Sequence, residues 1–208
     1  MTIAVVDYGI GNLGSVMKAF RHLGAPAILS GDIAELRRAD VLVLPGDGAF
    51  ASTMQEIESR GLVPVLREAV DQGRTLLGIC IGMQLLFEGS DESPGVDGLG
   101  ILPGRLRLLP DTVKRPQMQW NQLNFARADD PMVAGLGEHP WMYFVHSLHG
   151  VPTDPHDVVA TCEYGGTLNV AFRRGTVFAT QFHPEKSGPS GLALLANFVA
   201  AAAMVPAS

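Results

Sequence analysis

Short apolar runs alternate with helix-length segments over the first part of this chain of 208 residues. Runs rich in Val, Ile and Leu occupy residues 3–6, 27–29, 41–44 and 75–79. Each run is followed by a segment with helical periodicity, a rhythm typical of parallel strands whose two faces are both covered by helices. The pattern therefore predicts an α/β fold of three layers, with a mostly parallel central sheet between two layers of helices.

The second part of the chain changes character. Between Pro94 and Pro155 the sequence is rich in Pro, Gly and aromatic residues, with short stretches of alternation that favour hairpins. We expect a smaller mixed or antiparallel extension of the sheet here, followed by strands at 158–163, 168–172 and 176–182. Helices are expected at 15–23, 32–38, 51–59, 62–72, 81–87 and 189–203. The sequence has no linker or repeat, so residues 1–208 are predicted to form a single domain.

Composition and charge exclude several classes of protein. Apolar residues make up 47% of the chain and charged residues 17%, below the ~25% typical of globular proteins, which argues against disorder. The net charge is −6 and the basic residues form no block, so nucleic acid is not an expected partner. The longest apolar run, 192–205, is too short for the ~20 residues that a membrane span needs. The N-terminus resembles no secretory signal, so we expect a cytoplasmic protein with no membrane contact.

A cysteine framed by glycines stands where a predicted strand meets a predicted helix. In the segment 78–82, Gly-Ile-Cys-Ile-Gly, Cys80 occupies the place of the serine in a Gly-x-Ser-x-Gly elbow. At such a bend the glycines avoid collisions with the neighbouring strand and helix, and the start of the helix favours a thiolate. The alternative is a small buried core residue, which is how we interpret Cys162 in its plain strand pattern. Two cysteines with no paired ligand spacing predict neither a disulfide framework nor a metal site.

A histidine and a glutamate two residues apart follow the last predicted strand. Side chains at i and i+2 of a strand share a face, so His183 and Glu185 are expected to point the same way. The carboxylate can then accept from one imidazole nitrogen while the other nitrogen faces the thiol, as in a catalytic triad. His146 also ends an apolar strand and is a candidate to line the same site. The remaining histidines are interpreted as surface residues: His22, His139, His149 and His156.

These motifs resemble a known family. The segment 78–84, followed by His-Pro-Glu at 183–185, resembles the triad, or class I, glutamine amidotransferases. Within that family the chain is similar to the glutaminase subunits of imidazole glycerol phosphate synthase, of histidine biosynthesis, at residues 7–13, 44–50, 143–147 and 181–187. The resemblance spans nearly the whole chain and implies a class I glutamine amidotransferase-like fold with no cofactor.

The resemblance also implies a reaction. Cys80 would attack the side-chain carboxamide of glutamine, His183 would move the protons, and Glu185 would orient His183. A glutamyl thioester would form, release ammonia and hydrolyse to glutamate. The oxyanion would be bound by the backbone N–H groups of Ile81 and, from the loop 46–48, of Asp47.

Other positions are carried over from the family as contacts. The expected contacts to glutamine are Gly48, Gln84, His146 and Ser147. The expected partner is the cyclase subunit, a (βα)₈ barrel that receives the ammonia in a heterodimer, and the positions that would face it are Asn12, Trp120, Tyr143 and Lys186. Asp47 stands where the family more often has a small apolar residue, and Gln119 replaces a usual glycine. We expect the Asp47 side chain to face away from the oxyanion, because a second negative charge there is unfavourable.

Three other functions fit part of this pattern. A glutaminase serving another synthase, such as those of anthranilate, guanylate or pyridoxal phosphate synthesis, would share the triad. A cysteine hydrolase acting on esters or peptides would share the elbow but leaves Gln84 and the segment 7–13 unexplained. A non-catalytic regulatory subunit would keep the fold, yet all three triad residues are present here.

Overall fold

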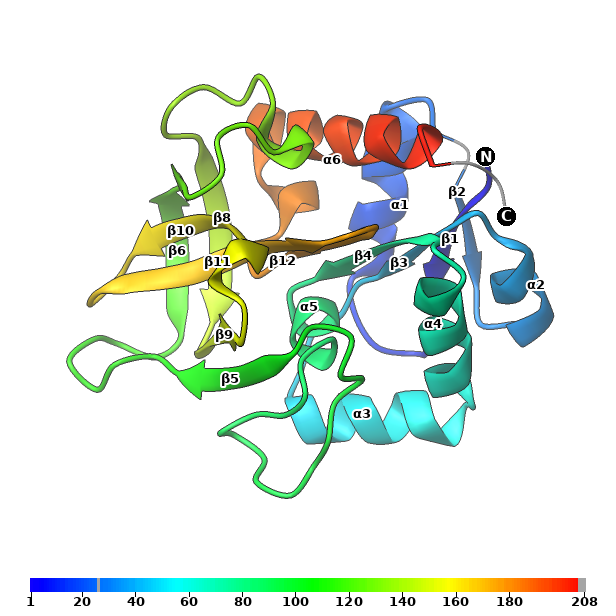
Figure 1. The fold of residues 1–208 in the computed structure, drawn as a ribbon, viewed down its shortest axis with the longest axis horizontal. Coiled ribbons are helices and arrows are strands. Elements are labelled where there is room, and N and C mark those ends of the chain that lie inside the picture. The colour runs from blue at the N-terminus through cyan, green and yellow to red at the C-terminus, as the bar shows by residue number, and fades with distance from the viewer. Residues whose placement is uncertain (26, 206–208) are drawn as a thin grey trace.

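The computed structural model describes residues 1–25 and 27–205, built around one eight-stranded sheet (Figure 1). The sheet order is β2-β1-β3-β4-β12-β11-β10-β7. Five neighbouring strands are parallel: β2 (Ala27–Ser30), β1 (Ile3–Val6), β3 (Val41–Leu44), β4 (Thr75–Ile79) and β12 (Val177–Thr180). The other three run antiparallel to their neighbours: β11 (Thr167–Arg174), β10 (Val158–Glu163) and β7 (Asn124–Phe125). The predicted, mostly parallel sheet is confirmed.

Helices cover both faces of this sheet (Figure 1). On one face lie α1 (Leu13–His22) and α6 (Gly188–Ala203). On the other lie α2 (Ile33–Arg38), α3 (Phe50–Ser59), α4 (Leu62–Asp71) and α5 (Ile81–Leu85). All residues of β1, β3, β4 and β12 are buried, because helices cover both faces of these strands. The three-layer prediction is confirmed.

Two antiparallel ribbons extend the fold beside the antiparallel half of the sheet (Figure 1). One pairs β5 (Gly104–Leu108) with β9 (Leu148–Pro152), and the other pairs β6 (Gln117–Gln122) with β8 (Trp141–His146). Short 3₁₀ turns occur at η1 (Pro131–Val133), η2 (Pro155–Asp157) and η3 (Pro184–Lys186). The antiparallel extension expected between Pro94 and Pro155 is therefore present, but each ribbon pairs strands that are not consecutive in the sequence, so neither is a simple hairpin.

Two expected boundaries were wrong near the site. Helix α5 ends at Leu85, because the next two N–H groups bond to carbonyls only three residues back and tighten the last turn. Strand β12 ends at Thr180, before the expected Phe182, because the chain turns to β8, where the His183 N–H donates to the carbonyl of Tyr143. Across the described residues, every helix is too short or too polar to cross a membrane.

Candidate active site

Cys80 lies at the sharp bend between β4 and α5. Its backbone has φ 55° and ψ −113°, and it is the one non-glycine residue with positive φ in the described part of the chain. A non-glycine residue in such a conformation costs of order 1–3 kcal/mol and persists only where the surrounding structure holds it. The bend leaves Cys80 5% exposed, beside a cavity of about 230 Å³.

The two glycines of the elbow are required by close approach. A Cβ on Gly82 would lie 1.7 Å from the Leu44 carbonyl oxygen of β3. A Cβ on Gly78 would lie 2.8 Å from the Met83 Cα of α5. Both distances are far below van der Waals contact, so helix α5 packs against β3 and β4 only because these side chains are absent. This is the collision that the sequence pattern led us to expect.

His183 and Glu185 point toward one another, although not for the reason expected from a strand. His183 is the residue before the 3₁₀ turn η3, and Glu185 lies within that turn. The turn brings the imidazole Nδ1 to 2.8 Å from the Glu185 Oε1. The His183 carbonyl also accepts a 2.6 Å hydrogen bond from the Ser187 hydroxyl, which fixes the turn. The pairing expected from i, i+2 alternation is therefore produced by a turn.

Burial and two neighbours set the charge of the His183 imidazole. Burial lowers its pKa, but the attraction of Cys80 and of the hydrogen-bonded Glu185 carboxylate outweighs burial and raises the pKa to about 10. The imidazole is therefore protonated at neutral pH. Its Nε2 has no hydrogen-bond partner among the described residues. Cys80, His183 and Glu185 thus lie together, with one ring nitrogen held by the carboxylate and the other available.

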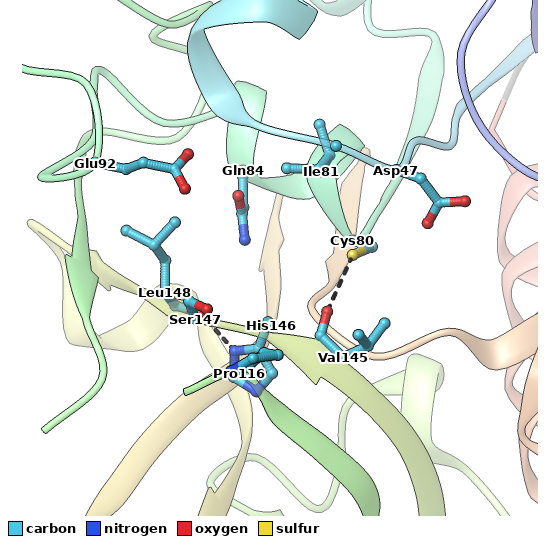
Figure 2. A pocket seen from close by; sticks show the side chains of 11 residues that line it. Asp47, Cys80, Ile81, Gln84, Glu92, Pro116, Val145, His146, Ser147 and Leu148 are labelled. Atoms are coloured by element: carbon cyan, nitrogen blue, oxygen red, sulfur yellow. Dashed lines mark hydrogen bonds between the residues drawn. The ribbon is translucent and has the colours of Figure 1, made fainter. Parts of the chain in front are cut away.

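The cavity beside Cys80 contains all the expected substrate contacts. Gly48, Gln84, His146 and Ser147 line it together with Asp47 and Ile81. Figure 2 shows Gln84 pointing from α5 into the space above His146 and Ser147. The Cys80 Sγ lies 3.9 Å from the Val145 carbonyl oxygen on the opposite wall. The cavity is therefore bounded by α5 on one side and by the end of β8 on the other.

His146 lines the cavity but is not available as a second base. Its Nδ1 lies 2.6 Å from the Leu148 carbonyl oxygen and its Nε2 lies 2.7 Å from the Gln117 side chain. Burial, as the main cause, lowers its pKa to about 4, so the ring is neutral. Among the histidines expected at the surface, His149 is an exception, since it is half-buried and burial lowers its pKa.

The Asp47 side chain lies at the edge of the site. It is 44% exposed, and Figure 2 shows its carboxylate directed away from Gln84 and from the space above His146. Its Oδ1 lies 4.0 Å from the Nε2 of His183. Its Oδ2 accepts a 3.2 Å hydrogen bond from the Asn12 N–H. That bond and the attraction of the imidazolium hold the carboxylate at the site. That the carboxylate faces away from the oxyanion stays a prediction, and the structure adds that it lies next to His183.

Two polar residues of the site were not identified from the sequence. Gln181 is fully buried, and its Nε2 donates to the Cys80 Sγ at 3.8 Å. Its position two residues before His183, at the end of the same apolar run, was a usable signal. Glu92 lines the cavity, and its Oε2 accepts a 3.0 Å hydrogen bond from the Phe50 N–H. It lies in an irregular loop, where no periodicity could have found it.

The residues expected at a partner surface lie around the site. Asn12 is exposed at the start of α1, and Lys186 lies in η3 beside Glu185. Trp120 and Tyr143 lie opposite each other on β6 and β8, with ring centroids 6.0 Å apart.

The second cysteine is a core residue, as expected. Cys162 is fully buried, and burial, as the largest cause, raises its pKa to about 12. Among the described residues, no group of three or more His, Cys, Asp or Glu side chains is arranged to hold a metal ion.

Comparison with known proteins gives consistent results. A family model described as glutamine amidotransferase class-I matches residues 4–202. The imidazole glycerol phosphate synthase subunit HisH of Synechococcus sp. (strain JA-3-3Ab) is 51% identical over 200 residues, which cover 95% of this chain and 92% of the relative. The protein of the same name from Geobacillus kaustophilus (strain HTA426) is 46% identical over 203 residues, with 95% of each chain covered.

Solved structures agree on the fold. A crystal structure of a glutamine amidotransferase matches with a TM-score of 0.78 at 22% identity, covering 97% of this chain and 99% of the other. The structure of PurLQS from Thermotoga maritima matches with a TM-score of 0.75 at 20% identity, covering 96% and 98%. At these identities the matches support the architecture of the sheet and its helices.

Proposed function

Because the chain belongs to the class I glutamine amidotransferase family, we propose that it is the glutamine-hydrolysing subunit of imidazole glycerol phosphate synthase, in histidine biosynthesis. The observation that carries this proposal is the grouping of Cys80, His183 and Glu185, in which Cys80 lines the cavity. Relatives that are about half identical over nearly the whole chain are named imidazole glycerol phosphate synthase subunit HisH, and this name supports a role in histidine biosynthesis.

The first half of the reaction uses the protonated His183. The thiol proton of Cys80 resides on the imidazole, and the thiolate attacks the carboxamide carbon of glutamine. The resulting oxyanion is held by the backbone N–H of Ile81 and by the loop that contains Asp47. As the carbon–nitrogen bond breaks, His183 Nε2 gives its proton to the departing nitrogen, which leaves as ammonia. The products of this half are ammonia and a glutamyl thioester on Cys80.

The second half returns the enzyme to its starting state. Water enters the site of the departed ammonia and loses a proton to the now neutral His183 as it attacks the thioester carbon. The carbon–sulfur bond then breaks, which releases glutamate and restores the thiolate beside the imidazolium. Glu185 keeps Nδ1 of His183 protonated throughout, so that Nε2 exchanges the proton in both halves.

The cavity contains a negatively charged side chain that suits the α-ammonium group of glutamine. Glu92 is fixed by the Phe50 N–H, and its negative charge faces the same cavity as Cys80. Figure 2 places Glu92 and Asp47 on opposite sides of Gln84. A carboxylate held in this way suits the α-ammonium of the substrate, with the carboxamide end directed toward Cys80.

The surface beside the site suits a docking partner. One face of the β6–β8 ribbon exposes large apolar side chains, namely Met118, Trp120 and Trp141, and Tyr143 is half-buried on the same face. A contiguous exposed apolar face of this kind is typical of an interaction surface. We place the (βα)₈ cyclase subunit there, in a heterodimer, with Asn12 and Lys186 among the contacts. Docking beside the cavity lets ammonia pass to the second site without entering bulk water, where it would mostly be protonated.

Glutamate release tests the proposal. We expect the wild-type chain to release glutamate from glutamine, with a strong increase on adding the cyclase subunit of the same source and its nucleotide substrate. Cys80→Ala should abolish release in both conditions, whereas Cys162→Ala, at the buried thiol of the core, should retain it. Undiminished turnover by Cys80→Ala would overturn the assignment. Stimulation by an anthranilate or guanylate synthase partner, and not by the cyclase subunit, would assign the chain to that other synthase.

A further inference from the structure

Two buried amides connect the cavity to the sulfur of Cys80. The Gln181 Nε2 donates to the Cys80 Sγ at 3.8 Å, and the Gln181 Oε1 accepts from the Gln84 Nε2 at 3.0 Å. Gln181 is 0% exposed and Gln84 is 2% exposed. The remaining oxygen, Gln84 Oε1, is buried and has no hydrogen-bond partner among the described residues. The chain of hydrogen bonds therefore ends in an unused acceptor on a side chain that lines the cavity.

The two hydrogen bonds give this series of amides a direction, which suits a sulfur that acts as a thiolate. A thiolate is an acceptor only, so Gln181 must present its N–H to Cys80 and its carbonyl oxygen to the next group. Gln84 must then present its own N–H to Gln181, which leaves its carbonyl oxygen without a partner among the described residues. Reversing either amide would place two donors or two acceptors against each other inside a buried site, which costs about 1–3 kcal/mol.

We propose that Gln181 is a positioning residue that donates to the Cys80 thiolate and, through its bond to Gln84, fixes the Gln84 oxygen as an acceptor for the carboxamide N–H of the substrate. The second part rests on the proposed function, since it takes glutamine as the substrate. Gln84 lies one helical turn after Cys80, and both residues line the same cavity.

This arrangement discriminates the substrate from the product. The glutamine side chain offers two N–H donors to the Gln84 oxygen, whereas the side-chain carboxylate of glutamate offers only acceptors at neutral pH. Glutamate is therefore repelled at the position where glutamine is held. The same amide chain thus stabilises the nucleophile and disfavours rebinding of the product.

The donor role is tested without any substrate. The pH dependence of Cys80 alkylation by iodoacetamide reports thiolate formation in the folded chain, because Cys162 is fully buried. We expect Gln181→Leu to move the pH midpoint of the alkylation rate upward by about one unit, as a lost hydrogen bond to an ion predicts. Gln181→Glu should move it at least as far, because it places a second negative charge beside the sulfur.

The matched control makes the same amide-to-leucine change away from the site. Asn197 on α6 donates from its amide to the carbonyls of Met132 and Ala134. Asn197→Leu should leave the alkylation midpoint unchanged even if it lowers the melting temperature. If Gln181→Leu and Gln181→Glu, both with native circular dichroism, also leave the midpoint unchanged, the donor role is wrong.

The discrimination role is tested with the cyclase subunit present. In Gln181→Leu the Gln84 amide is free to reverse, so the ratio of the glutamate inhibition constant to the glutamine KM should fall about tenfold. Gln181→Glu still accepts from Gln84 and should keep the wild-type ratio while kcat falls. An unchanged ratio in Gln181→Leu would overturn this role. Failure of the proposed function would give a different result: the wild-type chain would release no glutamate, whereas the alkylation experiment would still report on the donor role of Gln181.

Discussion

The Asp47 carboxylate Oδ1 lies 4.0 Å from the Nε2 of His183, the ring nitrogen that must face the substrate. The Asn12 N–H holds the other carboxylate oxygen, so the charge stays beside the cavity in the free chain. Because an oxyanion develops next to this position in the proposed reaction, Asp47 opposes the chemistry that His183 and Cys80 perform. A partner that rearranges the start of α1, where Asn12 lies, would also move this charge.

Replacing that charge should therefore raise the activity of the free chain. We expect Asp47→Asn to increase kcat for glutamine without the cyclase subunit by roughly threefold to tenfold. The modest size follows from the 44% exposure of the Asp47 side chain, which lets solvent screen the charge. The measurement is glutamate release by the isolated chain. Glu58→Gln, which removes an exposed charge on α3, should have no effect, and a slower Asp47→Asn enzyme would contradict this account.

The framework around the site was predictable because it depends on local patterns. The four parallel strands at the start of the chain and the glycine-framed elbow follow from apolar periodicity and from the absence of side chains at Gly78 and Gly82. The pairing of His183 with Glu185 was predicted from strand alternation. The pairing is present, but a 3₁₀ turn produces it and not a strand. Spacing along the chain fixes which side chains are neighbours but not which backbone conformation joins them.

The electrostatic details were not predictable because they depend on contacts between distant segments. The position of the Asp47 carboxylate is decided by Asn12, 35 residues away, and by His183. The bond between Gln84 and Gln181 spans 97 residues. Glu92 comes from an irregular loop whose path follows from tertiary packing. Each of these requires the folded structure, because no periodicity links the two partners.

Stability should depend on pH through His183. Its pKa is about 10 in the folded chain, compared with about 6.5 when unfolded, because Cys80 and Glu185 outweigh the effect of burial. The folded state therefore holds the proton more tightly, and the stabilisation is complete below about pH 6.5 and lost as the pH rises through about 10. We expect the free energy of unfolding, measured with urea, to decrease over that range.

Glu185→Gln isolates this effect. Without the carboxylate the His183 pKa in the folded state falls, so the decrease in unfolding free energy between about pH 6.5 and 10 should become shallower. The same variant should lose about 10²-fold to 10⁴-fold in kcat, because the imidazolium is no longer stabilised. His22→Gln, an exposed position on α1, should keep the wild-type slope. Equal slopes for Glu185→Gln and wild type would exclude His183 as the titrating group.

A single methyl group in the elbow should separate α5 from β3. In Gly82→Ala the added Cβ meets the Leu44 carbonyl oxygen at 1.7 Å, and because that atom belongs to a buried strand it cannot move aside. We expect a loss of about 3 kcal/mol or more in the free energy of unfolding, together with loss of activity. Gly14→Ala in α1 is the control, since its nearest contact is 3.9 Å away, and alanine should hold or raise stability there. Tolerance of Gly82→Ala would refute the close packing.

The exposed ribbon face should carry much of the affinity for the cyclase subunit. Trp120 is 47% exposed and stacks edge-on against Tyr143, so it is a large, rigid apolar side chain already held in place before docking. Tryptophans with these properties are frequent among the residues whose truncation costs about 2 kcal/mol or more at interfaces. We therefore expect Trp120→Ser to weaken the complex by roughly 30-fold or more, measured by titration calorimetry.

The fold of the chain alone should hardly change in Trp120→Ser, because half of the side chain already faces solvent. The control is Met204→Ser, since Met204 is 84% exposed just after the end of α6, so that it removes an apolar side chain away from the ribbon. Met204→Ser should bind the cyclase subunit as wild type does. If both variants bound equally well, the partner would have to dock elsewhere, and ammonia released beside Cys80 would then have no protected route past the β6–β8 ribbon.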